Sequence, residues 1–165
     1  MDSLKSKYGE VYIVNMPAMR TAAYTCVSTE PEKDSIEVVK KWVTDSHLEG
    51  TARLFGFNTA PYAPTADNPG YGFGFCATVP EDAQITEPMS EKMLPGGLYA
   101  VISEDGDMMQ CWNRIMALFK DSEWEWDWDH ARHPVHPGLE EHIDRADGKG
   151  DFYQRVHVPV RKRTK

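Results

Sequence analysis

The sequence lacks the features of an exported or membrane-spanning protein. It contains no run of the ~20 apolar residues that a membrane-spanning helix needs, and its start, MDSLKSKYGE, has no hydrophobic signal segment. It has only three cysteines, Cys26, Cys76 and Cys111, each within an apolar stretch. An odd number of well-separated cysteines favours buried thiols in a reducing compartment over a disulfide framework. We therefore expect a cytoplasmic protein that does not associate with membranes.

Basic residues are also in deficit. The chain has 18 Lys and Arg against 26 Asp and Glu, a net charge of −8. Because phosphate contacts need a basic face, direct binding of nucleic acid is not expected. No phosphate-binding or dinucleotide-binding glycine motif occurs, and no cofactor is predicted. His130, His133 and His136 do not have the i, i+4 spacing of helical zinc sites, and Pro134 and Pro137 interrupt them, so no metal site is predicted either.

The residues that are present predict one α+β domain spanning 1–165. A length of 165 residues with 41% hydrophobic residues is sufficient for a sizeable core. Stretches rich in aromatic and β-branched residues predict strands, and apolar residues at helical spacing predict two helices. The strands are expected at 11–14, 20–28, 53–60, 72–80, 98–106, 139–144 and 154–160, and the helices at 36–46 and 108–119. Asp34 or Ser35 is the expected N-cap of the first helix, and 80–97 reads as a turn-rich seam.

One pattern occurs twice. Strand, helix, strand, strand fills roughly 11–80 and again 91–160, and TAAYTCVS aligns with GGLYAVIS so that Tyr24 matches Tyr99. Each half alone leaves a sheet edge and a helix face uncovered. The predicted fold is therefore two pseudo-symmetric halves forming one antiparallel sheet of about eight strands, with two helices on one face. A cleft between related halves is a common ligand site. Chance similarity of two amphipathic units is the alternative.

Four segments of the sequence, taken in order, resemble those of a known domain family. RLFGFNTAP, YGFGFCATVPED, PGGLYAVISEDG and PGLEEHI, followed by VHVPV, resemble GyrI-like, or AraC-type effector-binding, domains over about 11–160. This family includes the drug-sensing domains of multidrug-responsive transcription activators. The resemblance implies that a Glu on the penultimate strand, here Glu140, sits in a hydrophobic pocket and pairs with lipophilic cations. Some stand-alone members instead use such a Glu and a Tyr to hydrolyse strained toxins. His142 occupies the position where the family usually has that Tyr.

The residues around Glu140 fit cation binding on chemical grounds. Strand alternation places Leu139, Glu141 and Ile143 on one face, and Glu140 and His142 on the other. A carboxylate in apolar surroundings is costly to desolvate unless a positive charge joins it. A delocalised organic cation supplies that charge, and each aromatic face adds ~0.5–2 kcal/mol of cation–π attraction. The predicted ligand is therefore a small hydrophobic, aromatic cation. The alternative is that Glu140 is a solvated strand residue.

Aromatic residues complete the predicted site, although ordinary core packing is an alternative for each of them. Two further features have two interpretations. Glycines alternating with aromatics in 71–75 leave one strand face bare, for a ligand or for a helix. Trp124, Trp126 and Trp128 alternate with carboxylates and either rim the cleft or cap the core. The predicted ligand-binding residues are Glu140, His142, Phe55, Tyr71, Phe73, Tyr99, Trp112 and Trp126.

The leading functional hypothesis is a binding module for lipophilic cationic small molecules. Its partners are those ligands, and a protein partner or a homodimer remains open. Enzymatic activity is not the primary expectation. If the chain is an enzyme, it is a hydrolase in which Glu140 acts as general base or nucleophile and His142 transfers a proton. A third interpretation, suggested by the gyrase-inhibitor relatives, is inhibition through binding to another protein.

Overall fold

The computed structural model describes residues 2–6, 9–104, 108–129, 138–144 and 152–164. The chain divides into two compact units. The central unit is Ala18–Leu94, and the terminal unit combines Met1–Pro17 with Pro95–Lys165. Among the described residues, neither helix is long and apolar enough to cross a membrane.

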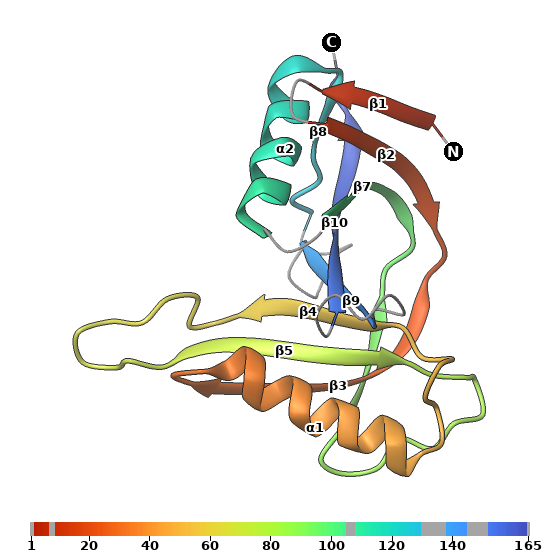
Figure 1. The fold of residues 1–165 in the computed structure, drawn as a ribbon, viewed down its shortest axis with the longest axis vertical. Coiled ribbons are helices and arrows are strands. Elements are labelled where there is room, and N and C mark those ends of the chain that lie inside the picture. The colour runs from red at the N-terminus through yellow and green to blue at the C-terminus, as the bar shows by residue number, and fades with distance from the viewer. Residues whose placement is uncertain (1, 7–8, 105–107, 130–137, 145–151, 165) are drawn as a thin grey trace. The chain divides into compact units, whose positions relative to one another are not determined.

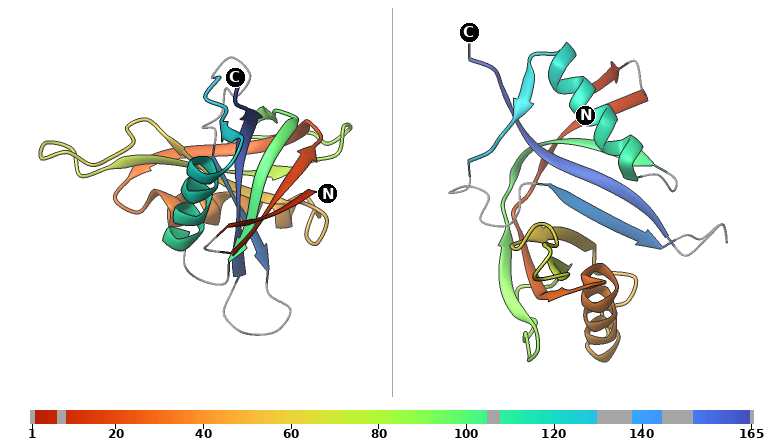
Figure 2. Two further views of the ribbon diagram at one scale, coloured as in Figure 1. Left: turned by 90° about the horizontal axis from the view of Figure 1, so that it is seen from above. Right: turned by 90° about the vertical axis from the view of Figure 1, so that its left-hand side faces the viewer.

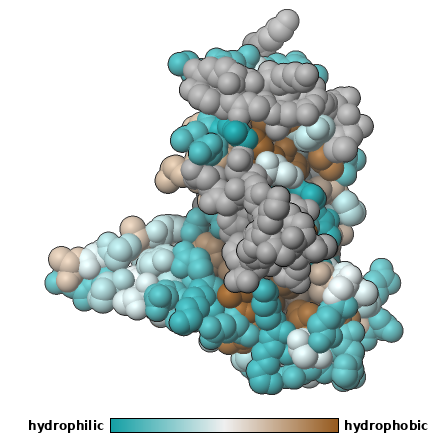
Figure 3. Space-filling view, in the orientation of Figure 1, coloured by the Kyte–Doolittle hydropathy of each residue, from teal (hydrophilic) through white to brown (hydrophobic). Residues whose placement is uncertain are grey.

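The central unit is a four-stranded antiparallel sheet with one helix. Its strands pair in the order β6-β3-β5-β4. Helix α1 lies along β3 and β5 (Figure 1), and Val39, Trp42 and Val43 of the helix pack against Phe73 and Phe75. The outer side of α1 is largely hydrophilic (Figure 3), as expected for an amphipathic helix. The elements are β3 (Met19–Ser28), α1 (Pro31–Asp45), β4 (Leu54–Thr59), β5 (Tyr71–Thr78) and β6 (Ser90–Leu94).

The terminal unit repeats this arrangement. Its strands pair in the order β1-β2-β7-β10-β9, and β8 pairs with the end of β10. Helix α2 packs on β7 and β10 (Figure 2), the two strands that correspond to β3 and β5. The elements are β1 (Asp2–Ser6), β2 (Gly9–Met16), β7 (Gly97–Glu104), α2 (Met108–Asp121), β8 (Trp124–Trp126), β9 (Leu139–Asp144) and β10 (Phe152–Lys162).

The predicted α+β class and the strand-helix-strand-strand pattern are confirmed, and the structure adds an exchange of strands. Strand β2 precedes β3 in the sequence, yet it pairs with β7 of the terminal unit. Strand β6 precedes β7, yet it pairs with β3 of the central unit. The segment just before β3 therefore belongs to the terminal sheet, and the segment just before β7 belongs to the central sheet. The assignment of 1–165 as a single domain with repeats at 11–80 and 91–160 stays a prediction.

Local details differ from the sequence expectation. Helix α1 begins at Pro31, about one turn before the predicted start, and its N-cap Glu30 makes no side-chain capping bond to a described residue. Proline suits the first helical turn because its missing N–H needs no partner there. Ser35, a predicted cap, lies inside the helix and donates to the Pro31 carbonyl oxygen at 2.5 Å. Strands β1, β6 and β8 were not predicted. Each is short, and SEKML of β6 is a charged edge strand without hydrophobic alternation.

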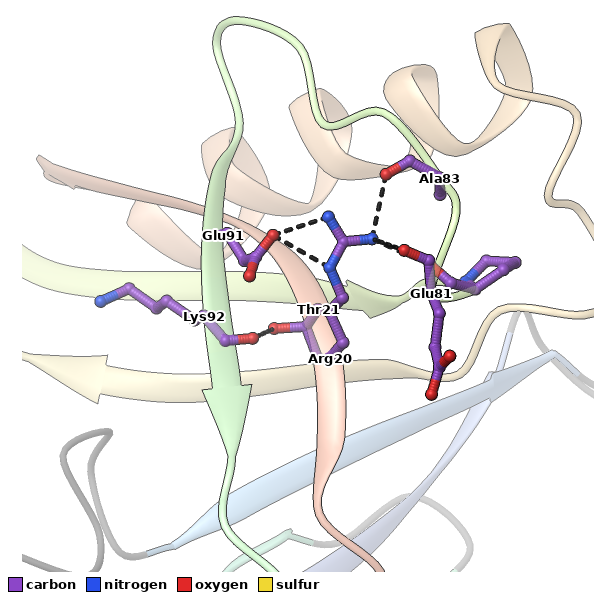
Figure 4. Close-up of polar contacts among 7 residues, drawn as sticks. Arg20, Thr21, Glu81, Ala83, Glu91 and Lys92 are labelled. Atoms are coloured by element: carbon purple, nitrogen blue, oxygen red, sulfur yellow. Dashed lines mark hydrogen bonds and ion pairs between the residues drawn. The ribbon is translucent and has the colours of Figure 1, made fainter.

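Arg20 of β3 links β6 to the rest of the central unit through hydrogen bonds (Figure 4). The Arg20 guanidinium on β3 donates to Glu91 Oε2 at 2.6 and 2.9 Å. It also donates to the carbonyl oxygens of Pro80 and Ala83, each at 2.9 Å. These contacts join the turn after β5 to β3 and β6. They explain how a strand with little hydrophobic character is held in register.

Two glycines of the central sheet, Gly56 and Gly74, lie under aromatic rings from the neighbouring strand. Gly74 pairs with Phe57, and Gly56 pairs with Phe75. A Cβ atom at Gly74 would lie 2.7 Å from the Phe57 ring and 2.7 Å from Thr25 Cγ2. At Gly74, the space that a side chain would take is therefore filled by Phe57 and Thr25 of the adjacent strands.

Gly74→Ala is expected to lower the free energy of unfolding by about 1–3 kcal/mol, because the added methyl group overpacks against Phe57 and Thr25. Urea denaturation monitored by circular dichroism measures the change. Adding Phe57→Leu to Gly74→Ala is expected to recover part of the loss, since the smaller side chain makes room. A single variant as stable as the parent protein would show that the ring moves aside freely.

Candidate functional site

The two faces of the terminal sheet differ in what covers them. On the face that carries α2, here called the helix face, Ile102 and Val156 pack with Ile115 and Leu118 of the helix. Register pairs Glu140 with Val156 and Glu141 with Arg155. Directly paired residues share a face, so Glu140 and His142 lie on the helix face. Leu139, Glu141 and Ile143 lie on the opposite face, and the predicted alternation is confirmed.

Glu140 and His142 are half-buried, and an indole lies close to them along β9. Gly138 is two residues before Glu140 and shares its face at a distance of about 7 Å. A Cβ atom at Gly138 would lie 2.6 Å from Trp112 Cη2. The Trp112 ring of α2 therefore covers the strand at Gly138, and glycine is required there by this close approach. The Trp112 ring therefore lies over the residue that precedes Glu140 on the same face of the strand.

Three indoles continue from this point as a group, here called the indole ladder: Trp112, Trp126 and Trp128. Trp112 and Trp126 stack with ring centroids 5.9 Å apart and planes at 22°. Trp126 and Trp128 stack at 4.1 Å and 26°. Trp126 is half-buried against the core, and Trp128 is 52% exposed. Trp124, in contrast, is buried in the core that α2 covers. The alternating tryptophans thus divide, with Trp124 capping the core and Trp128 open to solvent.

The opposite face contains a buried ionisable cluster that sequence reasoning did not identify. Glu141 is 4% exposed and His157 is 3% exposed. His157 Nε2 lies 2.8 Å from Glu141 Oε2, and Arg155 Nη1 lies 3.7 Å from the same oxygen. Arg155 Nε also donates to Ser103 Oγ at 3.0 Å. A buried carboxylate needs such partners. One sequence pattern could have indicated this cluster. Arg155 and His157 alternate on one face of β10, and Glu141 lies on the same face of the neighbouring strand β9.

Tyr99, a predicted ligand-binding residue, lies on the opposite face and not with Glu140. It pairs with Pro159 in the sheet and is 1% exposed. Its hydroxyl donates to the Pro95 carbonyl oxygen at 2.8 Å. Burial, and secondarily the negative charge of Asp127, raise the pKa of Tyr99 to about 12.

This raised pKa predicts an alkaline loss of stability. An unfolded tyrosine ionises near pH 10, whereas folded Tyr99 retains its proton up to about pH 12. The stabilisation is therefore complete below pH 10 and is lost as the pH rises from 10 to 12.

Tyr99→Phe is expected to be less stable than the parent at pH 9 by about 1 kcal/mol, through the lost hydrogen bond. That difference should shrink at pH 11 in urea denaturation. Tyr62→Phe, at an exposed tyrosine, is the control, and a Tyr99→Phe difference independent of pH would contradict the assignment.

The predicted aromatic residues of the central unit lie on different faces of its sheet. Phe73 is buried beneath α1, with its ring centroid 5.5 Å from that of Phe75. Tyr71 shares that face and donates its hydroxyl to Glu32 of α1 at 2.7 Å. Phe55 pairs with Cys76 on the other face and is fully buried. The structure therefore does not bring Phe55 together with Phe73 and Tyr71 within this unit. The predicted cleft between the two halves stays a prediction.

The terminal unit has a surface pocket of about 250 Å³ whose lining residues do not include Glu140 or any predicted aromatic residue. In the described part of the chain, no group of three or more His, Cys, Asp or Glu side chains is placed to hold a metal ion. His130, His133 and His136 lie outside the described residues. The pocket is lined by Gly96, Gly97, Leu98, Asp127, Val160, Arg161 and Lys162.

Comparison with known families identifies this arrangement. A family model described as integron-associated effector binding protein matches residues 12–154. The chain belongs to this family. The resemblance to GyrI-like effector-binding domains is thereby confirmed, and the protein is a member of a family of small-molecule-binding modules. A search of curated protein sequences finds no match.

Solved structures share the fold at low sequence identity. The C-terminal domain of EcmrR matches with a TM-score of 0.63 and 12% identity, covering 99% of this chain and 100% of that chain. An integron cassette protein from the mobile metagenome of Vibrio cholerae matches with a TM-score of 0.51 and 14% identity, covering 92% and 95%. SAV2435, solved with bound tetraphenylphosphonium, matches with a TM-score of 0.53 and 12% identity, covering 92% and 93%. These similarities establish the fold.

Proposed function

We propose that this chain binds small hydrophobic cations, preferably aromatic ones, through Glu140 on the helix face of the terminal unit. The observation that carries the proposal is the position of the Trp112 ring over Gly138, two residues from the half-buried Glu140 and on the same face of the strand. His142, on the same face, provides a second polar group at the site. Trp126, stacked on Trp112, extends the aromatic surface.

The physical basis is charge compensation in a partly apolar setting. Half-burial weakens the hydration of the Glu140 carboxylate, so an organic cation with diffuse charge replaces lost water at little cost to itself. Each indole face adds ~0.5–2 kcal/mol of cation–π attraction. Neither term requires a fixed hydrogen-bond geometry, and this favours a range of cations over a single ligand. A relative of the same fold, SAV2435, was solved with tetraphenylphosphonium, a ligand of this chemical class.

A charge-reversal comparison tests the proposal. The purified chain is titrated with tetraphenylphosphonium and, separately, with tetraphenylborate, an anion of nearly the same shape, and tryptophan fluorescence is recorded. We expect micromolar affinity for the cation, about −8 kcal/mol, and at least tenfold weaker binding of the anion. Equal affinities would show that apolar contact alone drives binding and would refute a carboxylate-centred site.

Hydrolysis is a second candidate function, favoured by the buried Glu141–His157 hydrogen bond of 2.8 Å. A carboxylate and an imidazole in contact can hold and transfer a proton near neutral pH. Turnover of ester and strained-ring substrates by the parent chain, lost in Glu141→Gln and kept in Glu140→Gln, would support this function. The reverse outcome would assign the chemistry to Glu140 and His142.

A further inference from the structure

Strand β3 is covered along only part of its length on the side away from β5. It has ten residues, and β6 pairs with it from its first residue, Met19, to Ala23. Continuing this register beyond Ala23 would place Pro88 opposite Thr25, and proline has no backbone N–H to donate. Among the described residues, no strand pairs with this side of β3 after Ala23.

The backbone groups of Thr25 and Val27 point to this uncovered side. The Arg20 carbonyl oxygen accepts a hydrogen bond from the Val79 backbone N–H at 3.0 Å, so the backbone of Arg20 faces the side of β5. Successive residues of a strand direct their backbone groups to alternate sides. The register between β3 and β5 continues unbroken to Ser28, so Thr25 and Val27 face away from β5. Thr25 is exposed and Val27 is 52% exposed. Each therefore offers an N–H and a C=O group to a further strand.

The repeated half shows that a longer strand fits at this position. In the terminal unit β2 lies beside β7 as β6 lies beside β3, and β2 has eight residues against the five of β6. Sheet edges are commonly protected from other chains by charged residues or proline. Residues 24–28, with the sequence YTCVS, contain neither. This part of β3 therefore lacks the usual protection against pairing with another chain.

On the sheet face away from α1, this edge is apolar. Val27 pairs with Gly72 of β5, which has no side chain to cover it. A Cβ atom at Gly70 would lie 3.3 Å from Val27 Cγ1, so the other neighbour of the valine is also a glycine. An apolar side chain of an added strand would pack against the exposed Val27 methyl groups.

On the face toward α1, this edge is acidic. Ser28 donates its hydroxyl to Asp34 Oδ2 at 2.5 Å, which places that carboxylate over the end of β3. Burial, and secondarily the negative charges of Asp34 and Glu32, raise the pKa of the Cys26 thiol. Residues 30–34 contain three carboxylates and one lysine. A basic side chain on an added strand is therefore favoured opposite Cys26.

We infer that the 24–28 edge of β3 binds an extended segment of a partner protein, which adds to the central sheet as an antiparallel strand. Apolar residues of the segment lie opposite Thr25 and Val27, and a basic residue lies opposite Cys26. Main-chain hydrogen bonds provide the affinity, and the alternating side chains provide the specificity.

A second copy of this chain does not match the edge. Self-pairing of two β3 strands places no basic side chain on the face toward α1, because residues 24–28 contain none. It also adds the carboxylates of a second 30–34 segment to that face. The edge belongs to the central unit and involves neither Glu140 nor the indole ladder, so this interaction is separate from the proposed function.

Peptides methylated on chosen backbone nitrogens test the interaction. A fluorescein-labelled heptapeptide of alternating lysine and valine is titrated with the full chain, and its fluorescence anisotropy is recorded. Valines opposite Thr25 and Val27 turn their N–H groups toward β3, and the lysines turn theirs away. N-methylation of the valines is expected to weaken binding by about tenfold or more, because those hydrogen bonds are lost. N-methylation of the lysines should change the affinity by less than about threefold. A peptide of alternating glutamate and valine should bind about tenfold more weakly than the lysine peptide.

Thr25→Pro tests the same hydrogen bonds from the side of the protein. The substitution removes an N–H that faces away from β5, and proline is tolerated at such edge positions, so the fold is expected to persist. The affinity for the lysine–valine peptide should fall by about tenfold or more. Thr25→Ala keeps the N–H and should bind within about threefold of the parent. Urea denaturation confirms that both variants are folded, and if Thr25→Pro is not, the methylated peptides decide.

Four outcomes would overturn the inference. Equal affinities of the two methylated peptides would show that binding does not use strand addition. Full affinity in a folded Thr25→Pro variant would move the peptide to another surface. Absence of binding by the parent chain would refute an alternating basic segment as the occupant. A dimer of the parent chain in sedimentation that Thr25→Pro dissociates would make a second copy the occupant. None of these results bears on cation binding at Glu140.

Discussion

Replacing Glu141 with alanine is expected to lower the free energy of unfolding by about 3–5 kcal/mol. The substitution removes the carboxylate that lies 2.8 Å from His157 Nε2 and 3.7 Å from Arg155 Nη1. His157, only 3% exposed, would then lose this carboxylate partner while remaining buried. Urea denaturation of the parent and the variant at pH 7 measures the difference.

Glu125→Ala is the matched control for this prediction. Glu125 is also a strand glutamate in a 2.8 Å ion pair, but its partner Arg161 is more than half exposed. Such a surface pair contributes about 0–1 kcal/mol, so the control should change stability little. The double variant Glu141→Leu/His157→Leu is expected to be more stable than Glu141→Ala, because it leaves no ionisable group of the pair buried. A loss below about 1 kcal/mol in Glu141→Ala would show that the cluster is solvated in solution.

Replacing Glu140 with glutamine is expected to weaken the binding of tetraphenylphosphonium by at least tenfold without unfolding the chain. Glutamine keeps the shape of the side chain but removes its charge, and interactions with a charged group contribute about 1.5–3 kcal/mol. Since Glu140 is only half-buried, the substitution leaves the packing beneath α2 unchanged. Fluorescence titration gives the affinity, and urea denaturation confirms the fold.

Glu141→Gln separates the two adjacent carboxylates in the same assay. It lies on the opposite face of β9, with its partner His157 on β10. We expect this variant to bind the cation within about threefold of the parent affinity, a difference below 0.7 kcal/mol. Loss of affinity in Glu141→Gln with none in Glu140→Gln would move the cation site to the opposite face, beside His157 and Arg155. Loss in neither variant would refute a carboxylate-centred site on β9.

Local patterns account for what could be predicted correctly. Period-2 alternation in LEEHID correctly separates Glu140 from Glu141, because strand geometry alone places successive side chains on opposite faces. Apolar spacing likewise predicts α2, which begins at Met108 as expected. Helix α1 was predicted to begin too late because its first turn starts with Pro31 and a run of charged residues, and the apolar stripe becomes visible only from Ile36.

The candidate site was predicted only in part, because its geometry depends on contacts distant in sequence. The position of Glu140 followed from the family resemblance, whereas the Glu141–His157 pair joins two strands and residues sixteen positions apart. Trp112 and Trp126 belong to a helix and a strand, and no sequence spacing indicates that their rings stack. Core packing, the alternative stated for each aromatic residue, holds for Phe73 beneath α1.

The α+β class, the repeated strand-helix-strand-strand order and the family could all be predicted from the amino-acid sequence, since they follow from local periodicity and the order of segments. The pairing of the strands could not be predicted in this way. Strand β2 pairs with β7, and β6 pairs with β3. Backbone hydrogen bonds do not depend on side-chain identity, so these pairings could not be predicted from the sequence. Packing and long-range contacts such as Arg20–Glu91 select the register. The tertiary structure also decided which carboxylate is buried with a histidine and which lies near the indoles. The surroundings of a strand side chain depend on the neighbouring strand, and local sequence patterns do not show which strand that is.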